Sequence, residues 1–188
     1  MADASVLRPS SLAHVVFRTK DLSRMLNFWT SFLGAERVFE NDFIAFLRYD
    51  EEHHRIAIIQ EPDTVPRVPT AAGLHHLAFS YTSLRALLRA HGEREKIGIK
   101  PTWCVNHGPT TSIYYKDPDG NAIETQVDNF ETVEKANVFM TSDEFRDNPI
   151  GTDFDPRDLL RQLNAGVEVS ALKRRVEIGV RQSVPAGV

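Results

Sequence analysis

An internal repeat limits the possible folds of this chain more than any other feature of its sequence. Residues 12–17 (Leu-Ala-His-Val-Val-Phe) are matched by residues 74–79 (Leu-His-His-Leu-Ala-Phe). Each copy begins as a short β-rich run and then enters a helical pattern of apolar residues. The repeat therefore indicates one supersecondary unit that occurs twice.

The two copies predict the same order of elements. In the first copy Asp21 can cap a helix that ends at Gly34, and in the second Thr82 or Ser83 can cap a helix with Gly92 near its end. Three short strands are expected after each helix, near residues 35–40, 43–49 and 54–60 and near residues 100–106, 110–116 and 121–127. The order of elements is therefore βαβββ twice.

This order predicts an α+β fold made of two βαβββ modules, residues 10–62 and 73–128. Each module would be a curved, antiparallel-rich sheet with a helix on one face, and the two sheets side by side would form an open cup. Residues 129–188 are expected to form a helical C-terminal extension within the same structural domain. In this extension we expect a helix from Asp155 to Gly166 and a second amphipathic stretch over residues 169–180, which either close over the cup or pack between subunits.

Composition excludes several classes of function. The net charge of −4 offers no basic surface for a nucleic acid. The longest uninterrupted apolar runs are about the length of residues 56–59, so no segment is expected to cross a membrane. The single cysteine, Cys104, rules out a disulfide framework and a cysteine-based zinc site. Because one thiol suits a reducing compartment and the first residues do not resemble a signal peptide, we expect a cytoplasmic protein.

The repeat also selects candidate metal ligands. It places His14 and His76 at equivalent points of equivalent strands, whereas His75 aligns with Ala13 and should point to the opposite face. Glu124 is the best third candidate, because it is a carboxylate inside an apolar strand. Two histidines and one carboxylate form the facial triad that leaves three positions open on iron.

A specific motif lies around the proposed third ligand. The stretch from His107 through Tyr114, Pro118 and Gly120 to Glu124 resembles the type I extradiol dioxygenase motif, with every element at an allowed spacing. These enzymes belong to the vicinal oxygen chelate superfamily, whose structural unit is βαβββ. The resemblance therefore implies the same modules that the repeat predicts.

A second resemblance lies in the first module. Residues 46–57 (Phe-Leu-Arg-Tyr-Asp-Glu-Glu-His-His-Arg-Ile-Ala) are similar to the segment of dihydroxybiphenyl-type enzymes in which the second histidine of the pair is catalytic. That histidine is His54 here. The familiar enzymes of this type are longer and carry an additional pair of modules, so the chain resembles the shorter one-domain group.

The resemblance implies a complete reaction. Fe(II), or Mn(II) as its substitute, would be held by His14, His76 and Glu124. The substrates would be O2 and a small catechol, either 2,3-dihydroxybiphenyl-like or otherwise substituted. The product would be a muconic semialdehyde or its ketone analogue that contains both oxygen atoms.

The resemblance also gives roles to three further side chains. Tyr114 would hydrogen-bond the catecholate oxygen. His54 would accept a proton from the diol and later assist cleavage of the O–O bond, and His107 would hydrogen-bond the substrate oxygen.

Two other functions remain open. A glyoxalase-like isomerase or epimerase of the same fold would use Zn, Ni or Co and typically four protein ligands. The first-module partner of Glu124 falls among residues 56–60, which hold no carboxylate, and Glu61 is the nearest one. A non-enzymatic ligand-binding protein would need no metal and should lack these histidines and the tyrosine. In each case the apolar faces of the C-terminal helices indicate a homo-oligomer.

Overall fold

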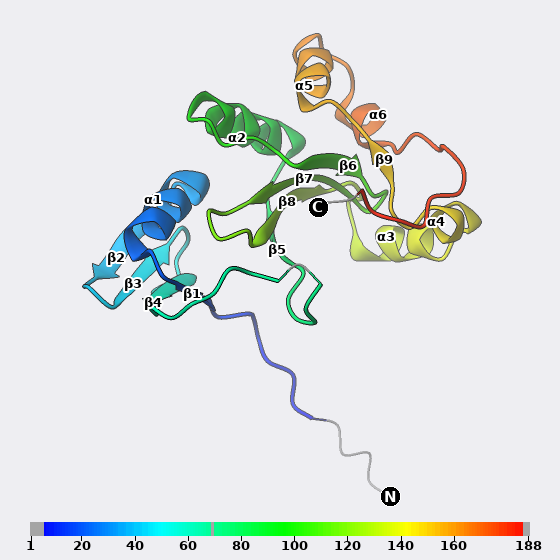
Figure 1. The fold of residues 1–188 in the computed structure, drawn as a ribbon. Coiled ribbons are helices and arrows are strands. Elements are labelled where there is room, and N and C mark those ends of the chain that lie inside the picture. Colours follow the sequence, from blue (N-terminus) through cyan, green and yellow to red (C-terminus); the bar gives the residue numbers. More distant parts are fainter. Residues whose placement is uncertain (1–5, 69, 186–188) are drawn as a thin grey trace, which may run out of the picture. The chain divides into compact units, whose positions relative to one another are not determined.

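The computed structural model describes residues 6–68 and 70–185, and it shows the predicted βαβββ order twice (Figure 1). The first module contains β1 (Val15–Thr19), α1 (Leu22–Leu33), β2 (Glu36–Glu40), β3 (Ile44–Arg48) and β4 (Ile56–Gln60). The second contains β5 (His76–Ser80), α2 (Leu84–Lys96), β6 (Trp103–Asn106), β7 (Thr110–Lys116) and β8 (Ala122–Asp128). The α+β fold expected from the repeat is confirmed.

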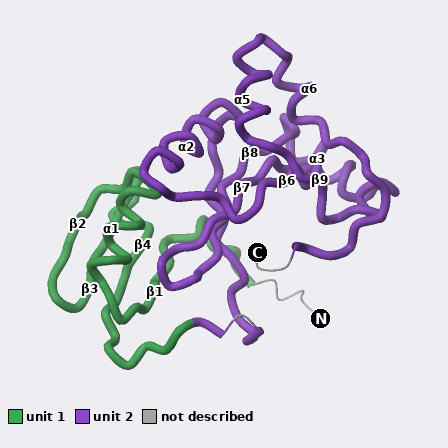
Figure 2. The backbone as a smooth tube through the Cα atoms, turned by 45° about the horizontal axis from the view of Figure 1, so that its top comes forward, with its two compact units in different colours: residues 1–66 green, residues 67–188 purple. Residues whose placement is uncertain are grey.

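A C-terminal extension follows the second module. It contains α3 (Val133–Met140), α4 (Asp143–Asp147), β9 (Thr152–Asp153), α5 (Pro156–Asn164) and α6 (Val169–Lys173). The chain divides into two compact units (Figure 2). Unit 1 ends at Pro66, and unit 2 begins at Arg67 and includes the whole described part of the extension.

Each unit has a mixed sheet built on the same plan. The strand order is β1-β4-β3-β2 in unit 1 and β5-β8-β7-β6-β9 in unit 2. The first strand of each module runs parallel to the last, and the remaining pairs are antiparallel. Val16 lies opposite Ala57 on β4, and Ala78 lies opposite Glu124 on β8. Because the repeat makes Val16 and Ala78 equivalent, Ala57 is the first-module counterpart of Glu124.

The helix of each module buries one face against its own sheet. In α1 the side chain of Asp21 accepts a hydrogen bond from Arg24 N at 3.0 Å, and Gly34 ends the helix at φ 64°, as predicted. Trp29 is fully buried and its ring stacks on Phe17, with the ring centroids 4.9 Å apart. These contacts fix α1 on its sheet.

Helix α2 is longer than predicted. Ser83 caps it, and its side chain accepts a hydrogen bond from Ala86 N at 3.1 Å. Gly92 is not near its end, because the helix continues to Lys96. The last turn buries Arg94 against the ring of Tyr115, and this tertiary contact outweighs the low helix propensity of one glycine.

The extension packs on the second module and differs from its prediction in two ways. The strand β9 was not expected, and it pairs with β6 at the edge of the second sheet (Figure 1). The amphipathic stretch predicted over residues 169–180 is helical only in α6, and the chain from Arg174 onward is not helical. The helix α5 begins after its cap Asp155, as predicted, and packs against α2.

Among the described residues, no helix combines the length and the apolar character needed to cross a membrane.

Candidate active site

An ion pair between neighbouring strands forms the centre of the candidate site in unit 2. His76 is the first residue of β5, and Glu124 lies in the parallel strand β8. Nε2 of His76 is 2.9 Å from Oε2 of Glu124, and the Glu124 side chain is only 7% exposed. Burial opposes ionisation of Glu124, but hydrogen bonds with His76 and Ser112 outweigh it and lower the pKa of this carboxyl below its ordinary value.

The spacing of this pair suits a shared metal ion. Two ligand atoms that bind one metal at about 2.1 Å and at right angles lie about 3 Å apart. An imidazole nitrogen and a carboxylate oxygen are ligands of the type that iron and manganese accept. Within the described residues of unit 2, no third His, Cys, Asp or Glu side chain joins the pair in a metal-binding cluster.

The contact with Glu124 is made by His76 rather than by its neighbour. His75 immediately precedes β5, and its Nδ1 lies 2.8 Å from Nδ1 of His76. The two rings are nearly perpendicular, at 84°. The two imidazoles are therefore in direct contact. The alternation of side chains along a strand had predicted that His75 and His76 point to opposite faces of the sheet.

Tyr114 and His107 lie beside this pair in the same sheet. Tyr114 on β7 is opposite Glu124 on β8, and its ring is 5.4 Å from the ring of His76. The hydroxyl oxygen of Tyr114 lies 3.0 Å from Nε2 of His107. Burial and then the Glu124 carboxylate raise the pKa of Tyr114 well above its ordinary value, so its hydroxyl stays protonated at neutral pH.

His107 is packed on three sides. Its ring meets the rings of Trp103 and Tyr114 edge to face, with centroid distances of 5.6 and 6.0 Å. Its Nδ1 contacts the backbone carbonyl oxygen of Ile150. Burial lowers the pKa of His107, and this effect exceeds the opposing effects of the Ile150 carbonyl and the Glu124 charge. The ring is therefore neutral at neutral pH.

Sequence reasoning missed three groups of this site. Ser112 could have been found, because it lies two residues before Tyr114 on a strand and therefore on the same face. Trp103 stacks on Tyr114 with the ring centroids 5.1 Å apart, and the register β6–β7 that places it there was not predicted. The carbonyl of Ile150 had no signal in the sequence, because any residue type supplies this group.

The remaining candidate residues lie together in unit 1. His14 is exposed and directly precedes β1, and its ring centroid is 4.6 Å from that of His54. The ring of His54 also packs on Phe46, with the centroids 4.8 Å apart. Burial, and then the neighbouring His53 and His14, lower the pKa of His54. In unit 1 the candidate ligand His14 and the candidate acid–base group His54 are therefore in contact.

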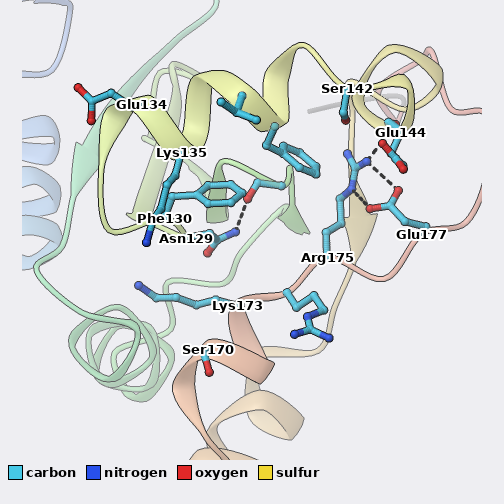
Figure 3. A pocket seen from close by; sticks show the side chains of 14 residues that line it. Asn129, Phe130, Glu134, Lys135, Ser142, Glu144, Ser170, Lys173, Arg175 and Glu177 are labelled. Atoms are coloured by element: carbon cyan, nitrogen blue, oxygen red, sulfur yellow. Dashed lines mark hydrogen bonds and ion pairs between the residues drawn. The ribbon is translucent and has the colours of Figure 1, made fainter.

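A separate cavity of about 870 Å³ lies in unit 2 and shares no residue with the site described above. Figure 3 shows that side chains of α3, α4 and the chain after α5 surround it. Its wall includes apolar groups, among them Phe130 and Phe139, and charged groups such as Lys135 and Glu134. Gly108, which follows His107, also lines it. This cavity is thus beside the candidate site and not within it.

Three comparisons relate this geometry to known proteins. The sequence model of the Glyoxalase/Bleomycin resistance protein/Dioxygenase superfamily matches residues 11–125. Two proteins of Rhodococcus globerulus are similar over most of their length. Biphenyl-2,3-diol 1,2-dioxygenase 2 is 40% identical over 85% of this chain and 85% of its own. Biphenyl-2,3-diol 1,2-dioxygenase 3 is 41% identical over 87% of each chain.

Solved structures agree in fold. The crystal structure of a glyoxalase/dioxygenase from Nostoc punctiforme aligns with a TM-score of 0.53 and 22% identity, over 66% of this chain and 97% of that chain. At this identity the agreement concerns the fold alone.

Proposed function

Because the chain belongs to the Glyoxalase/Bleomycin resistance protein/Dioxygenase superfamily, we propose that it is an extradiol dioxygenase that cleaves the aromatic ring of a catechol beside its two hydroxyl groups. Both oxygen atoms of O2 enter the product, a muconic semialdehyde or its ketone analogue. The observation that carries this proposal is the contact between His76 and Glu124, with the hydroxyl of Tyr114 beside it. A metal ligand pair and a hydrogen-bonding group for a metal-bound diol are thus on one sheet.

The proposed metal ligands are His14, His76 and Glu124. The metal is Fe(II), with Mn(II) as its substitute, because both accept nitrogen and oxygen ligands. When bound, the metal would hold the diol and O2 together and lower the pKa of the diol hydroxyls. Glu124 supports this role, because its carboxyl is held ionised despite its burial.

The chain's own groups would orient the diol and move its protons. Tyr114 is protonated at neutral pH and can hydrogen-bond a catechol oxygen next to Glu124. His107 is neutral, and its Nε2 lies within hydrogen-bonding distance of the Tyr114 hydroxyl. His54 is held neutral by its surroundings, so it can accept a proton from the diol and return it later.

The proposed substrate is 2,3-dihydroxybiphenyl or another substituted catechol. The named activity of the two Rhodococcus relatives supports this choice. The proposal also includes a reaction in the cytoplasm.

The register of the first module argues against a four-ligand isomerase. The counterpart of Glu124 is Ala57, which is buried and carries no ligand atom. Glu61, the nearest carboxylate, lies one residue beyond β4 and forms an exposed ion pair with Arg18. A metal-free binding protein would not need the pairing of His76 with a buried Glu124.

We further propose that the protein is a homo-oligomer. The eight residues of α3 include no buried side chain, and Val133 and Val138 are 70% and 72% exposed. Apolar helix faces of this kind are commonly covered by another chain. The partner would be a second copy, and neither a nucleic acid nor a membrane is part of the proposal.

The proposed activity can be tested directly. Anaerobically purified, Fe(II)-loaded protein is mixed with 2,3-dihydroxybiphenyl or catechol, air is admitted, and oxygen uptake is followed together with the yellow product. We expect both signals for at least one substrate, and their loss in His76→Ala and Glu124→Ala. Iron-loaded protein that consumes no oxygen with a panel of catechols would contradict the proposal and favour the isomerase.

A further inference from the structure

His107 is held in place by a part of the chain outside the two modules. It follows β6 and begins a tight turn, in which its N–H donates to the carbonyl of Thr110 at 2.9 Å. Its Nδ1 contacts the carbonyl oxygen of Ile150 in the extension. The strand β9 lies just after Ile150 and pairs with β6, where Thr152 is opposite Asn106. This pairing brings the carbonyl of Ile150 beside the His107 ring.

The turn of residues 148–151 presents this carbonyl. It is fixed by the side chain of Asn148 and by a close approach of Gly151 to β6. Asn148 is 1% exposed, and its Oδ1 accepts a hydrogen bond from Gly151 N at 2.6 Å. Gly151 has φ 109°, and a Cβ added there would lie 2.2 Å from the carbonyl oxygen of Asn106. The turn can therefore approach β6 this closely only with glycine at this position.

A buried cation joins the turn to His107. The side chain of Arg175 is 1% exposed, and its guanidinium donates to the carbonyls of Asn148 at 2.6 Å, Glu144 at 3.0 Å and His107 at 3.2 Å. Glu177 balances its charge at 2.7 Å, and Figure 3 shows the pair on the wall of the cavity. One side chain thus binds the backbone on both sides of the contact between His107 and Ile150.

This contact determines the tautomer of His107. A carbonyl oxygen only accepts hydrogen bonds, so Nδ1 must carry the ring hydrogen. In the neutral ring Nε2 then has a lone pair, which faces the hydroxyl of Tyr114 at 3.0 Å. This hydroxyl also hydrogen-bonds the Glu124 carboxylate, so both of its neighbours are acceptors and the lone pairs of its oxygen stay free for a donor. The opposite tautomer would set the lone pair of Nδ1 against the carbonyl of Ile150.

We propose that the extension positions His107 for the reaction: the Ile150 carbonyl, held by Asn148 and Arg175, fixes the Nδ1-protonated tautomer and so keeps the lone pair of Nε2 facing the Tyr114 hydroxyl. This inference rests on the proposed catechol substrate. A catechol hydroxyl can then donate to the free lone pairs of the Tyr114 oxygen, while Nδ1–H of His107 still donates to the carbonyl of Ile150.

The tautomer can be read without any substrate. Metal-free protein with 15N-labelled histidine is studied by NMR through the two-bond couplings between ring nitrogens and ring hydrogens, and the His107 signals are assigned by their loss in His107→Gln. We expect a protonated Nδ1 with a slowly exchanging hydrogen and an unprotonated Nε2. A wild-type His107 with protonated Nε2, or with both tautomers in exchange, would overturn the proposal.

The role of the extension is tested with Arg175→Gln. We expect the fixed tautomer to be lost, kcat for the catechol to fall by about 10- to 100-fold, and KM to change far less, since a positioning group acts through another residue. Arg175→Lys should retain part of the His107 tautomer preference and part of kcat. The matched control is Arg157→Gln, which removes an exposed contact between the extension and Glu95 on α2 and should leave the tautomer and kcat unchanged.

The outcomes separate this inference from the proposed function. Arg175→Gln with an unchanged tautomer and unchanged kcat would overturn the inference. If that variant does not fold, Asn148→Ala is judged by the same two criteria. If the wild-type protein cleaves no catechol, the proposed function fails, whereas the NMR spectra still report whether the extension fixes the His107 tautomer.

Discussion

Nε2 of His76 lies 2.9 Å from Oε2 of Glu124, and the two side chains come from parallel neighbouring strands of one sheet. The pair has two consequences. It gives the buried carboxylate a partner, and an unpaired carboxylate at this depth would be costly. It also keeps a nitrogen and an oxygen ligand at the spacing that one metal ion requires. In the proposed function, stability and metal binding therefore depend on the same two side chains.

The first prediction concerns metal binding. Glu124→Gln keeps the shape of the side chain but removes its charge, so we expect Fe(II) affinity to fall by at least about 100-fold. His76→Asn should have a similar effect. Bound iron is measured after anaerobic dialysis against a chelator. The matched control is His75→Asn, for which we expect a smaller loss. Equal losses in the two histidine variants would contradict the choice of His76 as the ligand.

The second prediction separates the two adjacent histidines of unit 1. His54 packs between His14 and Phe46, whereas the His53 side chain is 72% exposed and pairs with Glu52. If His54 moves protons, His54→Asn should lower kcat by about 100-fold or more while bound iron stays constant. His53→Asn should keep kcat within about 3-fold, because an exposed ion pair contributes little. The reverse order of effects would assign the acid–base role to His53.

The third prediction compares two adjacent tyrosines. Tyr114 faces Glu124, whereas Tyr115 is fully buried and its hydroxyl lies 3.2 Å from Nδ1 of His91. Tyr114→Phe should lower kcat by about 100-fold with little change in bound iron. Tyr115→Phe should leave kcat unchanged and cost about 1–3 kcal/mol of unfolding free energy, because it removes the buried hydrogen bonds with His91 and Arg94. Steady-state kinetics and urea unfolding of both variants distinguish these roles.

The repeat was enough to predict the fold, because hydrophobic period and capping residues act locally. Asp21, Gly34 and Ser83 each satisfy backbone groups within a few residues, and such signals are readable in one sequence. The family expected from residues 107–124 is confirmed by the superfamily match and the Rhodococcus relatives.

The extension was harder to predict, because its conformation depends on distant partners. The chain at Arg175 carries an amphipathic pattern that suits a helix, but three backbone carbonyls far away in the sequence bind its side chain. The pairing of β9 with β6 likewise depends on strands that are far apart in the sequence. Neither contact has a periodic signal. For the same reason the carbonyl of Ile150 could not be recognised as a partner of His107 before the structure was known.

The fourth prediction concerns the turn that carries Ile150. Gly151→Ala would place a Cβ 2.2 Å from the carbonyl oxygen of Asn106 and also force φ 109° on alanine. Backbone strain and overpacking together should reduce the unfolding free energy by about 2–4 kcal/mol. Gly166→Ala is the matched control, since φ is 86° there and no atom lies within 4 Å of the added Cβ. It should cost only about 1–2 kcal/mol. Equal costs in urea unfolding would mean that the close approach to β6 is relaxed in solution.

The fifth prediction concerns the pH dependence of stability. His91 on α2 is 4% exposed, and its Nε2 has no hydrogen-bond partner in the described structure. Burial lowers its pKa, and the nearby charges of Glu95, Arg157 and Arg94 partly cancel one another. The unfolded chain, with a histidine pKa of about 6.5, therefore binds the proton before the folded chain does. This contribution to stability is complete above about pH 6.5 and is lost as the pH falls toward the lower folded pKa.

His91→Gln removes this titration and leaves the other histidines in place. The unfolding free energy of the wild-type protein should consequently decrease more steeply than that of the variant between about pH 6.5 and 5. Urea unfolding at several pH values, with the slope compared between the two proteins, measures the difference. Since His54 and His107 also have lowered pKa values and remain in both proteins, only the difference in slope reports on His91. Parallel pH profiles would show that His91 is accessible to protons in the folded state, and that the packing of α2 on its sheet is looser than its 4% exposure implies.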